Sequence, residues 1–142
     1  VMCGGYGGTM EATSKGAQQA GGDVIGVTMD LFADRDPNPY LTKEKRVKDF
    51  YPRLKQLSSA DGFVVLMGGI GTLTEATLVW SLLETGQISA RPFVFVGDGW
   101  RDLFDAFRAV TFMRARDFDL ATVVDQVDDV LPVLEEAWPP GP

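Results

Sequence analysis

The sequence predicts a doubly wound α/β fold, a mainly parallel sheet with helices on both faces. Three observations support this. Short apolar, β-branched runs alternate with longer segments whose apolar residues have helical spacing. Glycine-rich segments follow two of the strands, where parallel sheets carry their ligand-binding loops. A length of 142 residues suits one domain, which we place at residues 1–138, with residues 139–142 as a tail.

The first part of the chain reads as two strands, each followed by a loop and a helix. We expect the strand at residues 1–3 to be the second of the sheet, with one βα unit of about 30 residues before it. The predicted elements are, in order, the end of a strand at Val1–Cys3, the loop Gly4–Gly8, a helix at Thr9–Ala20 stopped by Gly21-Gly22, a strand at Asp23–Thr28, a loop at Met29–Thr42 and a helix at Lys43–Ser59.

The long helix at Lys43–Ser59 follows from Val47, Phe50, Leu54 and Leu57, which recur at helical spacing. Pro52 lies inside it and predicts a kink or a break.

The second part of the chain repeats the alternation. Its predicted elements are a strand at Phe63–Leu66, the loop Met67–Gly71, a helix from about Thr72 to Thr85, a strand at Pro92–Val96, a helix at Trp100–Val110, a short strand at Ala121–Val124 and a helix to about Ala137.

Composition excludes several classes of function. One Cys and no His allow no intramolecular disulfide, no zinc site and no histidine base. No apolar stretch approaches the ~20 residues of a membrane helix, and no signal peptide is recognisable. We therefore expect a cytoplasmic protein without a metal or cofactor. The formal net charge of −7 argues against a nucleic-acid binder.

One segment is basic in this acidic chain. Lys43–Lys55 holds six basic residues against Glu44 and Asp49. This favours a small anionic ligand. A solvated helix face is the alternative interpretation.

The segment Met67–Glu75 has the pattern of a phosphate site. Glycines allow the backbone N–H groups to approach a ligand, and the start of the following helix attracts anions. No Gly-Lys-Ser/Thr and no G-x-G-x-x-G occurs, which disfavours ATPases and dehydrogenases. Two interpretations of Glu75 stay open. It completes a capping box with Thr72 as N-cap, or it stabilises positive charge that develops on a sugar beside the phosphate.

The loop Gly4–Gly8 is either a second ligand cradle or a tight strand–helix connection, since both require glycine. Asp30 is either a ribose acceptor or a solvated carboxylate. Cys3, beside this loop, is by default a small buried thiol.

Two motifs resemble those of one known family. The first consists of Cys3–Ala12 with Gly16-Ala17 and Gly21–Val27, and the second is Gly68-Gly69-Ile70-Gly71-Thr72-Leu73-Thr74-Glu75. They are similar to the first half and to the signature P-G-G-x-G-T-x-x-E of the LONELY GUY (LOG) family, whose members are often labelled lysine decarboxylases. The resemblance covers nearly the whole chain. The molybdenum-cofactor carrier proteins share the same core.

The resemblance implies a Rossmann-like homodimer. It also implies a phosphoribohydrolase that cleaves cytokinin riboside 5′-monophosphates, or in some relatives AMP, into free base and ribose 5-phosphate. In this family the signature residues hold the phosphate, and a glutamate and an arginine are catalytic. These correspond here to Gly68, Gly69, Gly71 and Thr72, then Glu75 and Arg53. The first loop adds Gly4, Gly5, Gly8 and Met10 as nucleotide-binding candidates.

The chain departs from the family pattern at two places. Met67 replaces the signature proline, and Arg53 stands one residue closer to the following strand than is usual, with Arg46 as the fallback. A non-catalytic carrier of a pterin cofactor, or a nucleotide sensor, is the alternative function. No lysine is marked as a pyridoxal-phosphate anchor, so the decarboxylase label has no support.

Overall fold

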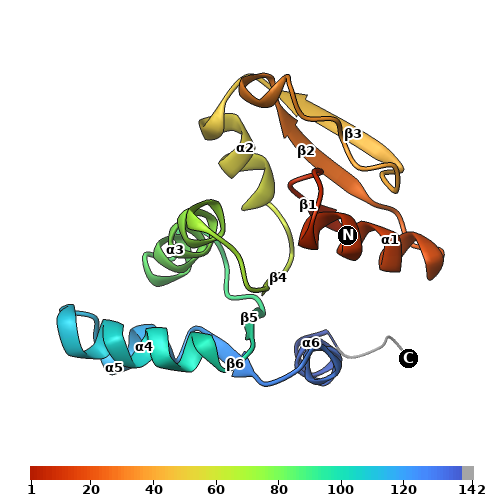
Figure 1. The fold of residues 1–142 in the computed structure, drawn as a ribbon. Helices are drawn as coiled ribbons and strands as arrows, with labels where there is room; N and C mark the ends of the chain where they lie inside the picture. Colours follow the sequence, from red (N-terminus) through yellow and green to blue (C-terminus); the bar gives the residue numbers. More distant parts are fainter. Residues whose placement is uncertain (139–142) are drawn as a thin grey trace. The chain divides into compact units, whose positions relative to one another are not determined.

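The computed structural model describes residues 1–138, and the chain forms two compact units, Val1–Ala60 and Asp61–Pro142. Each unit contains one three-stranded parallel sheet with its helices, and Figure 1 traces the elements in chain order. The prediction of an α/β fold built on parallel strands is confirmed, with the strands divided between two sheets. The single-domain boundary stays a prediction, and the predicted tail lies outside the described residues.

The first unit has the strand order β1-β2-β3. Met2 pairs with Ile25 across β1 and β2, and Thr28 pairs with Arg46 across β2 and β3. The elements are β1 (Met2–Cys3), α1 (Thr9–Gln19), β2 (Ile25–Met29), the 3₁₀ helix η1 (Asp30–Phe32), β3 (Lys43–Val47) and α2 (Phe50–Leu57).

The predicted helix at Lys43–Ser59 is wrong in its first half, because Lys43–Val47 is strand β3. In this run every side chain except that of Val47 is charged, and the segment is specified by backbone pairing with β2 rather than by apolar periodicity. The helix begins at Phe50, where the Asp49 side chain accepts a hydrogen bond from the Tyr51 N–H at 3.1 Å. Pro52 lies in the first turn of α2, where its missing N–H costs no hydrogen bond. The proline therefore marks the start of a helix and not a kink inside one.

The second unit has the strand order β4-β5-β6. The elements of this unit are β4 (Phe63–Val65), α3 (Ile70–Glu84), β5 (Phe93–Val96), α4 (Gly99–Val110), α5 (Ala115–Phe118), β6 (Thr122–Val124), the 3₁₀ helix η2 (Val127–Asp129) and α6 (Val130–Ala137). Among them, the short helix α5 was not predicted.

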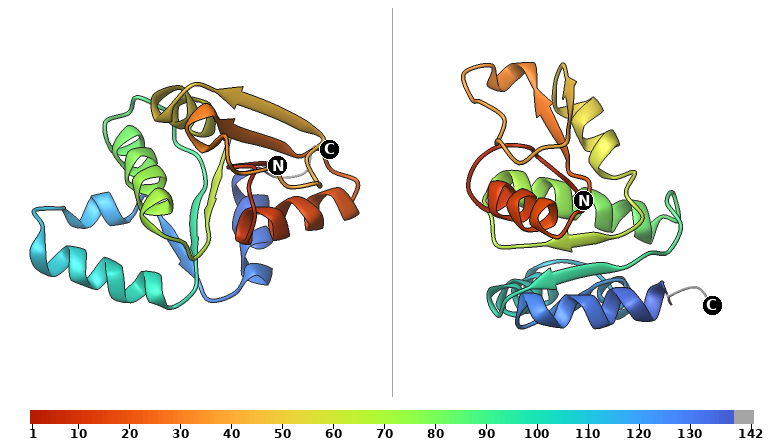
Figure 2. Two further views of the ribbon diagram at one scale, coloured as in Figure 1. Left: turned by 45° about the horizontal axis from the view of Figure 1, so that its top comes forward. Right: turned by 90° about the vertical axis from the view of Figure 1, so that its right-hand side faces the viewer.

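Alternate residues of β5 divide the core of this unit into two layers, as strand geometry requires. Phe93 and Phe95 pack with aromatic side chains of α3, α4 and α5, whereas Val94 and Val96 pack against α6. Accordingly, α6 lies away from α4 and α5 in Figure 1 and in the left view of Figure 2. Helices on both faces are thus confirmed for this sheet. The aromatic layer consists of Trp80, Phe93, Phe95, Trp100, Phe104 and Phe118.

None of the helices described within residues 1–138 is long and apolar enough to cross a membrane.

Candidate functional site

The first glycine loop, Gly4–Gly8, connects β1 to α1 and is crowded. Gly5 has φ +81°, a conformation that side chains rarely adopt. A Cβ on it would lie 3.0 Å from Cγ2 of Thr28 and 3.1 Å from Cα of Gly26. Glycine is required here by the backbone conformation and by close packing against β2.

A buried asparagine fastens this loop. The Asn38 N–H donates to the Gly5 carbonyl at 2.9 Å, and its side-chain amide donates to the Tyr6 carbonyl at 3.1 Å and to Ser14 Oγ at 3.2 Å. Only 6% of Asn38 is exposed. A role for this residue was not predicted, and its one signal in the sequence is its position between Pro37 and Pro39.

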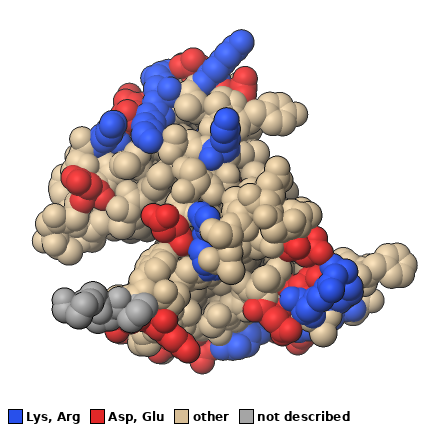
Figure 3. Space-filling view, turned by 180° about the vertical axis from the view of Figure 1, so that it is seen from behind, with Lys and Arg blue, Asp and Glu red and all other residues tan. Residues whose placement is uncertain are grey.

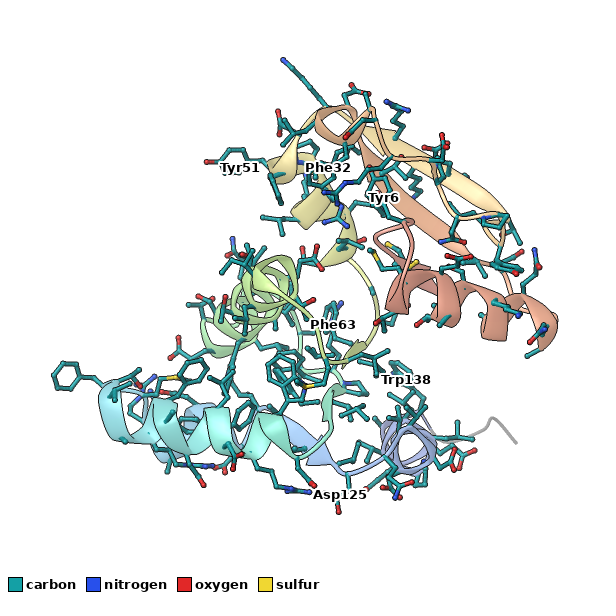
Figure 4. All side chains as sticks on the ribbon, in the orientation of Figure 1. Tyr6, Phe32, Tyr51, Phe63, Asp125 and Trp138 are labelled. Atoms are coloured by element: carbon teal, nitrogen blue, oxygen red, sulfur yellow. The ribbon has the colours of Figure 1, made fainter. Side chains whose placement is uncertain are left out.

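Tyr6 also holds this loop in place, through its hydroxyl and its ring. Its hydroxyl accepts from the Met29 N–H at 2.8 Å and lies 3.3 Å from the Met29 carbonyl, at the end of β2. Its ring meets Phe32 edge to face, with centroids 5.7 Å apart (Figure 4). The loop is therefore held by both backbone and side-chain contacts.

Arg53 is buried in this unit, with 6% of the residue exposed. It lies on α2, and its Nε donates to the Val27 carbonyl at 2.9 Å. A Cβ on Gly4 would collide with the guanidinium of Arg53 and with Sδ of Met10. The structure thus brings together three predicted site residues, Gly4, Met10 and Arg53. A buried guanidinium beside a glycine backbone is an uncommon arrangement and is suited to holding an anion.

The fallback residue, Arg46, has a different setting. It lies on β3 rather than on a helix and forms an exposed ion pair with Asp30 at 2.7 Å. The hydrogen bond that Arg46 donates to the Asp30 carboxylate raises the pKa of Arg46 above its ordinary value. Asp30 is accordingly a solvated carboxylate with an arginine partner. Cys3 is half-buried, with Sγ 3.4 Å from Ser14 Oγ.

The second glycine loop leads from β4 into α3 and is open. Met67 and Ile70 are 62% and 81% exposed. A Cβ on Gly69 or Gly71 would meet no atom within 4 Å. The loop leads into α3, a helix of 15 residues, and the first N–H groups of a helix have no partner within the helix.

The capping box predicted for Thr72 and Glu75 is wrong. Helix α3 begins at Ile70 with Gly69 as its N-cap, and no side chain caps it. Thr72 is therefore the third helical residue. Glycine is an acceptable N-cap, and the helix starts three residues earlier than an N-cap at Thr72 would place it. This removes the capping interpretation of the half-buried Glu75.

The Thr72 side chain turns back toward the loop. A Cβ on Gly68 would collide with it, so that glycine makes room for the hydroxyl. Thr74 and Thr77 donate to the carbonyls of Ile70 and Leu73. Among the hydrogen bonds found for residues 1–138, by contrast, none involves the Thr72 hydroxyl. Open backbone N–H groups and an uncommitted hydroxyl suit a phosphate group.

Comparison with known proteins shows which family the chain resembles. Residues 10–134 match the model of the family described as "Possible lysine decarboxylase". A cytokinin riboside 5′-monophosphate phosphoribohydrolase of Mycobacterium tuberculosis is 31% identical over 140 residues, covering 92% of this chain and 73% of that protein. The chain belongs to the LOG family.

Two further relatives carry similar names. A cytokinin riboside 5′-monophosphate phosphoribohydrolase of Mycobacterium marinum is 29% identical over 150 residues, which is 99% of this chain and 76% of that protein. A probable enzyme of the same name from Oryza sativa subsp. japonica is 29% identical over 144 residues, covering 96% of this chain and 62% of the rice protein.

Met67 is the departure from the LOG signature that the structure explains best. Its side chain lies along the loop after β5, where a Cβ on Gly99 would be 3.5 Å from Cε and 3.7 Å from Sδ of Met67. The third glycine segment, Gly97–Gly99, thus leaves space for this side chain, and Gly97 adopts φ +110°.

The predicted site residues of this LOG protein fall into two groups, one in each unit, and each group is described within its own unit. The first unit holds Gly4, Gly5, Gly8, Met10 and Arg53, and the second holds Gly68, Gly69, Gly71, Thr72 and Glu75.

Proposed function

We propose that this protein hydrolyses the N-glycosidic bond of a nucleoside 5′-monophosphate, a cytokinin riboside 5′-monophosphate or AMP, to free base and ribose 5-phosphate. The observation that carries the proposal is the open loop at the start of α3, with its exposed glycines and the Thr72 hydroxyl. Membership of the LOG family and the names of three relatives support it.

The phosphate binds to the backbone N–H groups of residues 68–72 and to the Thr72 hydroxyl, where the helix start favours negative charge. Glu75 follows Thr72 by three residues on α3, so both side chains lie on one side of the helix. A phosphate held at Thr72 therefore places its ribose toward Glu75.

Glu75 acts on the ribose. As the bond between C1′ and the base nitrogen breaks, positive charge develops on the sugar, and a carboxylate stabilises that charge. Water forms the new bond to C1′, and Glu75 helps to orient it. The departing base takes a proton from water or from another side chain, since the chain has no histidine. The resemblance to the LOG family implies that Arg53 is the second catalytic residue.

The first loop contributes Gly4, Gly5, Gly8 and Met10 to nucleotide binding. We place the active protein in a homodimer, as the family resemblance implies, and the reaction in the cytoplasm.

The test is chromatographic detection of free base after incubation with AMP and with isopentenyladenosine monophosphate. We expect release from at least one nucleotide, and a loss of about 10³-fold or more in kcat for Glu75→Gln, with the affinity for ribose 5-phosphate nearly unchanged. Thr74→Val, at an exposed neighbouring site, is the matched control with normal turnover. Intact nucleotide in both wild-type incubations would contradict the proposal and favour a carrier or sensor.

A further inference from the structure

Met67 lies where strand β4 has ended and the open glycine loop begins. It follows the last strand residue, Val65, by two positions and directly precedes Gly68. Strands β4 and β5 pair in parallel, so the loops that follow them leave the same edge of the sheet. The loop after β5 is the glycine segment Gly97–Gly99. The apolar side chain of Met67, 62% exposed, therefore has a second loop beside it.

The Met67 side chain lies along this glycine segment. A Cβ on Gly99 would be 3.5 Å from Cε and 3.7 Å from Sδ of Met67, and a Cβ on Gly97 would be 3.9 Å from its Cγ. These are ordinary van der Waals distances. An unbranched thioether adapts to such an irregular surface better than a branched side chain does.

The glycine segment is a fixed support for this side chain. The Gly97 N–H donates to the Val124 carbonyl of β6 at 2.8 Å, and the Gly97 carbonyl accepts from the Trp100 N–H at 3.1 Å. Trp100 is buried, and its ring packs on that of Phe95 with centroids 4.9 Å apart. The loop after β5 is thus bound to β6 and to the core, whereas the open glycine loop is exposed throughout.

The proposed phosphate site of the second unit relies on backbone N–H groups, because the cations of this unit are few. Residues 61–142 contain five arginines and no lysine. Lys and Arg atoms lie next to Asp and Glu atoms where α4 and α5 lie (Figure 3). The arginines in ion pairs with carboxylates are Arg101, Arg108, Arg114 and Arg116. An N–H group binds an acceptor only over a narrow range of angles, so the conformation of the loop decides how well it binds phosphate.

We infer that Met67 is a positioning residue that holds the open glycine loop in its phosphate-binding conformation. Glycines give this loop more conformational freedom than other residues would, and binding has to remove that freedom. The LOG signature has a proline at this position, whose ring fixes the backbone. In this chain the contact between Met67 and Gly97–Gly99 supplies the restriction instead. Met67 acts through the N–H groups of residues 68–72 and not through an atom of its own.

The test is isothermal titration calorimetry of the whole chain with ribose 5-phosphate, with circular dichroism to confirm folding. Met67→Ala removes the atoms that lie along the glycine segment. We expect it to raise the dissociation constant about threefold to fivefold, the scale on which restricting the backbone of one residue acts. Met67→Leu keeps an apolar side chain of similar volume, and Met67→Pro fixes the backbone through its ring. Both should bind within about twofold of wild type.

Leu131→Ala is the matched control, because Leu131 is 59% exposed on α6, which packs on the other face of the sheet. It should leave the dissociation constant unchanged. A dissociation constant of Met67→Ala equal to that of wild type would overturn the inference. So would a loss of binding in Met67→Leu, Met67→Pro or Leu131→Ala as large as that in Met67→Ala.

The inference rests on the proposed phosphate site and not on hydrolysis. A weaker phosphate site affects bound substrate and transition state alike, so Met67→Ala should raise KM by the same factor and leave kcat within about twofold. A fall in kcat without a rise in KM would contradict the positioning role. If the variants change ribose 5-phosphate binding as expected and wild type releases no base, the proposed reaction alone is contradicted. If wild type binds no ribose 5-phosphate, both are.

Discussion

The two glycine loops of this protein have similar sequences and opposite surroundings. In Gly4–Gly8, Gly4 and Gly5 are buried, and a side chain on either would strike neighbouring atoms. In Met67–Gly71, every residue is exposed, and Gly69 and Gly71 have open space around them. Asn38 and Tyr6 fasten the first loop to its unit, whereas the second loop leads directly into an uncapped helix.

This difference separates two reasons for glycine. In the first loop glycine permits a backbone conformation and close packing, so its loss mainly costs stability. In the second loop glycine keeps the start of α3 uncovered, so its loss mainly costs ligand binding. The two sets of variants should therefore respond in different assays.

The largest effect on stability is expected for Gly5→Ala. It combines a left-handed conformation with overlap against Thr28 and Gly26, and we expect a loss of about 3 kcal/mol in the free energy of unfolding. Urea denaturation measures it. Gly8→Ala is the control, because Gly8 has φ +71° but open space, and should cost only about 1 kcal/mol. Equal losses for both would mean that crowding at Gly5 is unimportant.

Asn38→Ala tests the fastening of the first loop. It leaves the buried Tyr6 carbonyl without its amide donor, and we expect a loss of about 2 kcal/mol in the same assay. Tyr6→Phe removes the bonds to Met29 and should cost about 1 kcal/mol. If Asn38→Ala costs less than about 0.5 kcal/mol, the loop does not depend on this residue.

Thr72→Val tests the second loop with nearly no change in shape. The Thr72 hydroxyl has no hydrogen bond in the described part of the chain, so the free energy of unfolding should change by less than about 0.5 kcal/mol. Loss of a hydrogen bond to a charged phosphate should raise the inhibition constant of ribose 5-phosphate about tenfold. Thr74→Val, whose hydroxyl bonds the Ile70 carbonyl, is the control with unchanged inhibition. Equal inhibition of Thr72→Val and wild type would argue against the phosphate site.

The smallest effect is expected for Arg46→Ala. Its ion pair with Asp30 is exposed, so stability should change by less than about 0.5 kcal/mol and turnover by less than about twofold. Arg53→Ala, which removes a buried guanidinium, should lower both markedly. Loss of turnover in Arg46→Ala alone would reverse the assignment of the arginine.

The alternation of elements could be predicted because buried strands such as Phe93–Val96 are short, continuous and apolar. Strand β3 escaped prediction because its polar side chains carry no such pattern, and its backbone partners lie on β2, distant in sequence. The start of α3 was misplaced for a related reason, since glycine at an N-cap gives no side-chain signal.

In the candidate site, too, residues in a local motif could be predicted, and residues whose role depends on distant partners could not. The motif residues Gly68–Glu75 could be found because their spacing is local. The role of Gly4 could not, since it depends on Arg53 reaching it from α2. Nor could the role of Asn38, whose partners Gly5, Tyr6 and Ser14 lie 24 or more residues away.

Gly71→Ala tests the difference between the loops most directly, because Gly71 lies inside the first turn of α3 with no atom nearby. Alanine favours a helix over glycine by roughly 0.5–1 kcal/mol, so the variant should be at least as stable as wild type. Its methyl group would cover the proposed phosphate site. The inhibition constant of ribose 5-phosphate should rise about tenfold or more, which corresponds to the loss of one hydrogen bond to a charged group. Unchanged inhibition in a stable Gly71→Ala chain would contradict the account.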